Sequence, residues 1–118
     1  MREHIDSFLN YLTAEKGYSE NTTMAYRNDL SSLADFASSE LGKKNIEISW
    51  ANFNREAMLA YLLDLKERGY VATTVARKVA AARSFFNFLV AEGIIKTDPT
   101  ENMSSPSVGK ALPKPIPV

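Results

Sequence analysis

Basic and hydroxyl side chains, the types that bind phosphates and base edges, gather between Tyr70 and Ala91. This segment contains three basic residues and no acidic residue. Its polar residues are Thr73, Thr74, Arg77, Lys78 and Arg83, interleaved with the small residues Ala76, Ala80, Ala81 and Ser84. Small residues let a helix approach a groove closely, while cationic and hydroxyl groups bond to phosphates or base edges. The combination favours insertion into a major groove, although such a basic helix face is also typical of a solvated surface.

A second polar group lies nearer the start of the chain. It comprises Ser19, Asn21, Thr22, Thr23 and, a turn later, Arg27. If Ser19 caps a helix, these residues fall in its first turns, where free backbone amides and the helix dipole favour anions. Two such helix faces would together grip one duplex.

The spacing of apolar residues predicts the helices that carry these groups. The first spans residues 2–16, with an apolar face of Ile5, Phe8, Leu9 and Leu12, and Gly17 stops it. The second is capped by Ser19 and runs through the stripe Tyr26, Leu30, Leu33, Phe36 and Ala37 to a polar loop at residues 42–45. Residues 46–53 alternate in polarity and are predicted to form an extended connector, because a lone strand has no partner.

Two further helices follow the connector. Asn54 caps the third, which runs to about Arg68 and is closed by Gly69. The fourth spans about Ala72 to Ala91, with Arg77 and Lys78 expected on its polar face. Its inward stripe is Val75, Val79, Ala82, Phe86, Leu89 and Val90. The sequence therefore predicts an all-α, four-helix domain over residues 1–93, followed at 94–118 by an irregular, proline-rich linker.

Several kinds of chemistry lack the residues they need. The chain has no cysteine and a single histidine, His4, which excludes thiolate metal sites and the usual acid-base clusters. No glycine-rich loop can cradle a phosphate, and no tyrosine has arginine and histidine neighbours in sequence. We therefore expect no catalytic residue, no cofactor and no metal. The charged amino terminus and the absence of a long apolar run predict a cytoplasmic protein without a membrane span.

The formal net charge is +0, which does not favour nucleic-acid binding by itself. A neutral chain can still have one positive face, because the distribution of charge decides the local potential.

The order of several sequence strings resembles Xer-type tyrosine recombinases and phage-type integrases. The strings are Phe8-Leu9-Asn10-Tyr11-Leu12, Glu15-Lys16-Gly17-Tyr18-Ser19-Glu20-Asn21-Thr22, Tyr26-Arg27-Asn28-Asp29-Leu30, Thr74-Val75-Ala76-Arg77-Lys78, Arg83-Ser84-Phe85-Phe86-Asn87-Phe88-Leu89 and Glu92-Gly93. The tail continues the likeness with Asp98-Pro99, Pro106 and Leu112-Pro113-Lys114. The resemblance covers nearly the whole chain in the right order.

The resemblance implies the four-helix, SAM-like core-binding domain of that family, which clamps one side of double-stranded DNA. It implies DNA contacts from the second helix through Asn21, Thr22 and Arg27, and from the fourth through Thr73, Thr74, Arg77, Lys78 and Arg83. Lys114 would lie in the segment that crosses the DNA to a separate catalytic domain.

The family's catalytic residues would follow this segment, so the fragment alone is expected to be inert and monomeric. The parent would cleave DNA through a tyrosyl-phosphate, without a cofactor, and join strands within a tetramer of protomers. The sequence does not separate a chromosome-dimer resolvase from a mobile-element integrase.

One departure and two alternatives accompany the resemblance. Val71 stands where the family often has a serine cap, so the fourth helix could instead be capped by Thr73. A helical protein-interaction module would be favoured if Phe85 and Phe88 formed an exposed apolar patch. A complete small enzyme is disfavoured by the missing site chemistry.

Overall fold

Short polar side chains start two of the four helices. The Ser19 hydroxyl accepts a hydrogen bond from the backbone N–H of Thr22 at 3.2 Å, and the Asn54 side chain accepts one from Ala57 at 2.9 Å. The computed structural model describes residues 1–101, and in this part the regular elements are all helical. They are α1 (Arg2–Ala14), α2 (Glu20–Lys43), the 3-10 turn η1 (Trp50–Asn52), α3 (Arg55–Glu67) and α4 (Ala72–Ala91). The predicted all-α fold and both caps are confirmed.

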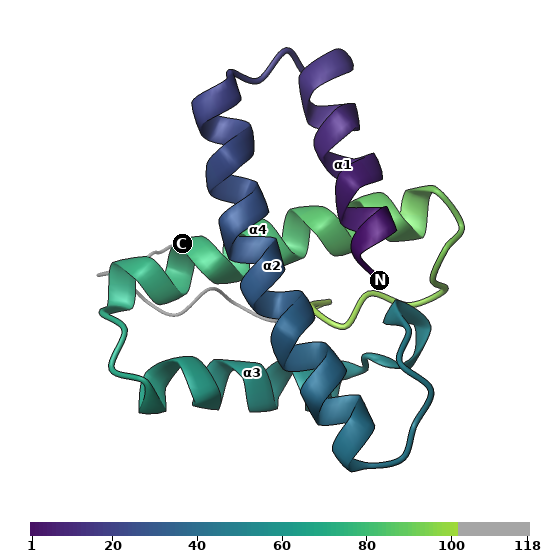
Figure 1. Ribbon diagram of the computed structural model, residues 1–118, viewed down its shortest axis with the longest axis vertical. Coiled ribbons are helices and arrows are strands. Elements are labelled where there is room, and N and C mark those ends of the chain that lie inside the picture. The colour runs from purple at the N-terminus through teal and green to yellow at the C-terminus, as the bar shows by residue number, and fades with distance from the viewer. Residues whose placement is uncertain (102–118) are drawn as a thin grey trace, which may run out of the picture.

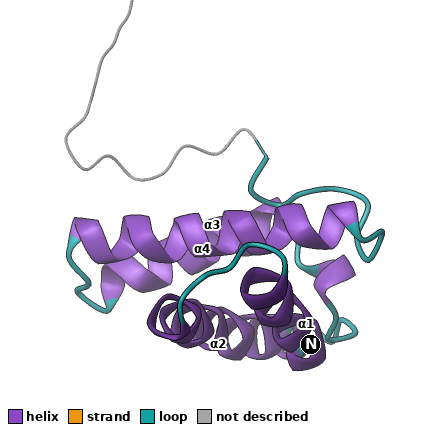
Figure 2. Cartoon of the chain, turned by 90° about the horizontal axis from the view of Figure 1, so that it is seen from above, coloured by secondary structure: helices purple, strands orange, loops and turns teal. Residues whose placement is uncertain are grey.

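The helices form two layers. Figure 1 shows α2 crossing both α3 and α4, with α1 lying over α4, and Figure 2 shows the two pairs one above the other. Helix α2 is the longest and packs against each of the other three, whereas α1 also contacts α4. The predicted polar faces on α2 and α4 therefore belong to two helices that touch.

The core is centred on α4 and is rich in aromatic rings. Phe85 and Phe86 are both fully buried. The Trp50 ring lies edge-on to both, with centroid distances of 5.0 and 5.6 Å, and Phe53 stacks on Phe86. Such offset and edge-to-face pairs add to the hydrophobic gain from burying the rings. Phe8 of α1 lies edge-on to Phe85 at a centroid distance of 5.6 Å, so both helix layers contact one aromatic cluster.

The connector between α2 and α3 differs from the extended segment that the sequence predicts. Residues Trp50–Asn52 form a 3-10 turn, closed by a hydrogen bond from the Phe53 amide to the Trp50 carbonyl at 3.1 Å. Trp50 and Phe53 are buried, while Ile46 and Ile48 stay exposed. The alternation of apolar residues therefore does not mark a strand. The residues of this segment that reach the core, Trp50 and Phe53, lie at the start and end of the 3-10 turn.

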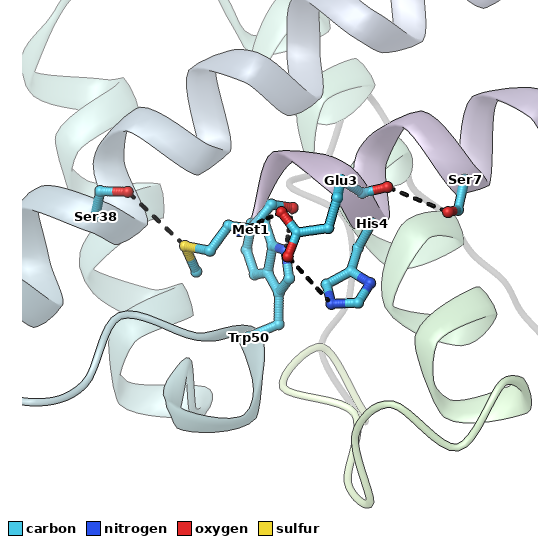
Figure 3. Close-up of polar contacts among 6 residues, drawn as sticks. All are labelled: Met1, Glu3, His4, Ser7, Ser38 and Trp50. Atoms are coloured by element: carbon cyan, nitrogen blue, oxygen red, sulfur yellow. Dashed lines mark hydrogen bonds and ion pairs between the residues drawn. The ribbon is translucent and has the colours of Figure 1, made fainter.

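The amino terminus is tied to this turn. The Trp50 indole N–H donates to the Met1 carbonyl at 3.0 Å, and the Ser38 hydroxyl of α2 contacts the Met1 sulfur at 3.8 Å (Figure 3). The terminal ammonium pairs with Glu3 at 3.0 Å. A buried indole N–H needs such a partner, so the start of α1, the carboxyl-terminal part of α2 and the connector are joined.

The chain continues to pack on the domain after α4. Ile95 is buried in the core cluster, and the Arg55 guanidinium donates to the Glu101 carbonyl at 2.6 Å. The proline-rich remainder of the predicted linker lies outside the described residues.

Candidate nucleic-acid interface

The amino-terminal end of α4 presents open backbone donors. Helix α4 begins at Ala72, and Val71 occupies the cap position; among the described residues no side chain caps it. The alternative start capped by Thr73 is therefore wrong. The first helical bond at this end runs from the Val75 amide to the Val71 carbonyl at 3.0 Å. The amides of the first turn, beside Thr73 and Thr74, can thus donate to an anion, where the helix dipole also favours negative charge.

A buried carboxylate lies behind the basic residues of α4. Asp29 of α2 is 3% exposed. Its Oδ2 accepts from Arg77 Nε at 3.0 Å, and its Oδ1 accepts from Arg77 Nη2 at 3.0 Å and from Lys78 Nζ at 3.1 Å. These hydrogen bonds and the negative charge of Asp29 raise the pKa of Arg77 above its ordinary value. Three charged groups therefore join α2 to α4.

The two basic neighbours lie differently. The Arg77 side chain is 60% exposed, whereas that of Lys78 is 8% exposed. The Lys78 ammonium also lies 5.3 Å from the centre of the Tyr70 ring, a cation–π geometry. The expectation that Lys78 stands on the polar face beside Arg77 is wrong, because its ammonium is buried against Asp29. Only Arg77 of this pair reaches solvent.

The sequence did carry a signal for this buried cluster. Lys78 follows Val75 by three residues and precedes Ala82 by four, so it lies on the apolar stripe of α4. Asp29 holds the same place on α2, between Tyr26 and Leu33. Charged residues on the inward stripes of two helices indicate a buried pair, because a lone buried charge is too costly.

The start of α2 faces the same region. Thr22, Ala25 and Tyr26 line a shallow, mainly apolar crevice with Arg77 and Ala80 of α4. The Thr22 hydroxyl accepts from the Ser19 hydroxyl at 3.0 Å, which leaves its own hydrogen to donate outward. The structure therefore brings together two of the predicted contact residues, Thr22 and Arg77, across the junction of the helices.

The other predicted residues are placed less directly. Asn21 is exposed in the first turn of α2, and Arg83 is partly buried on α4. Arg27 is turned toward α1, where its Nη1 lies 3.2 Å from Asp6 Oδ1 in an exposed ion pair. Lys114 lies outside the described residues. Asp29 offsets one of the positive charges of α4, so the surface around Arg77 is less basic than the sequence indicates.

Further observations bear on other kinds of site. Phe85 is fully buried and Phe88 is partly buried against the core, so they form no exposed apolar patch. Within the described residues no group of histidine, cysteine or acidic side chains could hold a metal, and no helix there is long and apolar enough to cross a membrane. His4 lies 3.9 Å from Glu3, whose pKa is lowered by a hydrogen bond from the terminal ammonium (Figure 3).

The described residues form a small, all-helical domain of two crossed helix pairs, with Thr22 of α2 and Arg77 of α4 on one surface. Comparison with known families is specific: the model of the phage integrase N-terminal SAM-like domain matches residues 5–93. The chain belongs to this family.

Curated relatives agree with the family. The chain is 44% identical over 118 residues to a tyrosine recombinase XerC from Herpetosiphon aurantiacus, covering 100% of this chain and 37% of the relative. It is 42% identical over 114 residues to a XerC from Roseiflexus castenholzii, covering 97% and 35%. A XerD from Agrobacterium fabrum is 36% identical over 110 residues, covering 93% and 31%. The chain thus spans about a third of the length of these relatives. No solved structure matches the chain significantly.

Proposed function

We propose that this chain is a DNA-binding domain that grips one face of a recombination site through α2 and α4. The observation that carries the proposal is the junction of the two helices, where Arg77 and Thr22 share one crevice. Arg77 offers a guanidinium, Thr22 a hydroxyl and the uncapped start of α4 its amides. These are the donors that proteins use for phosphates and base edges. The family and the names of the curated relatives support the same function.

The proposed contacts fall into three groups. The first group meets the duplex directly, because its members lie in the first two turns of α2 and α4: Asn21, Thr22, Thr73, Thr74 and Arg77. Arg27 and Arg83 contribute at the edges of this surface, and Arg27 must exchange Asp6 for a phosphate. Lys114 would act from the following segment. We omit Lys78, since its ammonium already has Asp29 and Tyr70 as partners.

The wider function follows from the likeness to tyrosine recombinases. The domain at residues 1–93, with 94–118 as linker, would serve a protein whose separate catalytic domain cleaves and rejoins DNA through a tyrosine. Protomers would assemble as a tetramer on two sites, in which residues 1–93 would supply DNA contacts and the separate catalytic domain the cleavage chemistry. The protein would act in the cytoplasm and require no cofactor.

Binding to a duplex at several salt concentrations tests this function. Fluorescence anisotropy with a labelled duplex of about 20 base pairs should give a Kd that rises steeply with salt, because each neutralised phosphate releases counterions. Arg77→Ala should weaken binding by about 1 to 3 kcal/mol, or 5- to 150-fold. The matched control is Arg2→Ala, since Arg2 pairs with Asp35 away from the crevice. Equal affinities for the two variants, or binding indifferent to salt, would reject the proposed surface.

A further inference from the structure

The carboxylate of Asp29 has a position that its charge alone does not explain. A negative charge beside a DNA-binding surface repels phosphates, yet Asp29 lies directly behind the guanidinium that we assign to the duplex. An exposed position would let water screen this charge, but Asp29 is buried. Lys78 and Arg77 offset this charge, and the geometry of the Arg77 pair can add a favourable contribution to DNA binding.

The geometry of the contact supplies such a contribution. Nε and Nη2 of Arg77 each donate to a different oxygen of Asp29 at 3.0 Å, so the guanidinium plane is fixed by two parallel bonds. A free arginine side chain loses much rotamer entropy when it is immobilised on a ligand. Here that freedom is already removed in the unbound protein.

The support for Asp29 is itself rigid. Lys78 Nζ donates to Asp29 Oδ1 at 3.1 Å, and the same ammonium lies 5.3 Å from the centre of the Tyr70 ring. Asp29 is also 3% exposed, so the packed helices around it hold the carboxylate in place even without the Lys78 ammonium. Of the five guanidinium N–H groups, two are used by Asp29, and the others belong to a side chain that is 60% exposed.

We propose that Asp29 is a positioning residue for DNA binding, which holds Arg77 so that its outward N–H edge meets a two-oxygen acceptor of the duplex. The acceptor has the chemistry of a phosphate oxygen pair or of the O6 and N7 edge of guanine. This inference rests on the proposed function. It adds that a buried acidic residue strengthens binding to a polyanion.

The sign of one substitution separates positioning from simple electrostatics. Asp29→Asn removes a negative charge, so charge alone predicts tighter binding to DNA. Positioning predicts weaker binding, because an amide offers Arg77 one acceptor oxygen in place of two. To keep the domain folded without the buried carboxylate, both forms are compared in a Lys78→Met background, which removes the buried ammonium.

The decisive experiment is a set of duplex affinities at low salt with this background. Asp29→Asn should raise Kd about 2- to 12-fold, the range for immobilising one long side chain. In a chain that already carries Arg77→Ala, adding Asp29→Asn should not raise Kd further. The control is Asp35→Asn, which removes an acidic residue from the exposed pair with Arg2, away from the crevice, and should leave Kd unchanged. The proposal would be overturned if Asp29→Asn lowered Kd. It would also be overturned if Asp29→Asn raised Kd equally in chains with Arg77 and with Arg77→Ala.

A second readout uses the free protein and does not depend on DNA. The Arg77 Nε–H NMR signal should show restricted motion in the Lys78→Met form and become mobile with Asp29→Asn. A signal equally mobile in both would refute the positioning role, whereas a rigid signal in a chain that binds no duplex would refute the proposed function. The acceptor is identified by salt dependence: if it is phosphate, Arg77→Ala lowers the slope of log K against log salt by about 0.9. If it is guanine, the loss instead varies with base sequence.

Discussion

Removing the Asp29 carboxylate should destabilise the domain far more than removing an exposed acidic residue. Asp29→Ala leaves the Lys78 ammonium, 8% exposed, without its counterion. Breaking a buried pair in this way costs about 3 to 5 kcal/mol. For a domain of about 100 residues each kcal/mol lowers Tm by about 4 to 8 °C, so Tm should fall by about 12 °C or more.

The matched variants isolate the reason for this loss. Lys78→Met should cost less than Asp29→Ala, because Asp29 keeps both bonds from Arg77 and no buried ammonium is left without a counterion. Adding Lys78→Met to Asp29→Ala should recover most of the lost stability. Asp6→Ala, in an exposed pair with Arg27, should cost about 0 to 1 kcal/mol.

Urea unfolding followed by far-ultraviolet circular dichroism measures all four variants. A loss below about 1 kcal/mol for Asp29→Ala would mean that water reaches Lys78 and that the buried cluster is absent. An equal loss in Asp29→Ala with and without Lys78→Met would show that the stranded ammonium is not the cause.

Three further predictions concern the core, the pH dependence and a helix cap. Phe86→Ala should cost about 3 to 5 kcal/mol in urea unfolding, because the ring is fully buried; unchanged stability would contradict the register of α4. Burial raises the pKa of Tyr61 from 10.0 to about 12, so the neutral phenol stabilises the fold below pH 10. About 2 to 3 kcal/mol should be lost as the pH rises from 10 to 12, and Tyr61→Phe should remove this loss. Asn54→Ala should cost about 0.5 to 2 kcal/mol and Asn54→Asp much less, since aspartate restores the bond to Ala57; equal losses would argue against the cap.

The helices could be predicted because local signals define them. Ser19 and Asn54 cap as expected, and α4 has the predicted bounds because its apolar residues recur without interruption from Val75. Helix α1 ends at Ala14 and not at Lys16, where the amides of Glu15 and Lys16 both turn back to the Tyr11 carbonyl. Ends of helices depend on such individual bonds, which periodicity does not specify.

The candidate site was predicted in outline and not in its electrostatics. The sequence identifies α2 and α4 as the polar pair, because hydroxyl and basic residues cluster on both. It did not lead to the pairing of Asp29 with Lys78, since these residues are 49 positions apart and meet only when the two helices pack. The stripe position of Lys78 in α4 indicates burial, but one helix alone does not show which residue of another helix is its partner.

Mapping the duplex onto the domain by NMR tests the central claim most directly. Backbone amide shifts would be followed while a duplex of about 20 base pairs is added at low salt and again at high salt. The proposed function predicts salt-sensitive shifts concentrated at residues 21–27 and 73–83. Shifts confined to other surfaces, such as the exposed side of α3, or shifts that persist unchanged at high salt would contradict it.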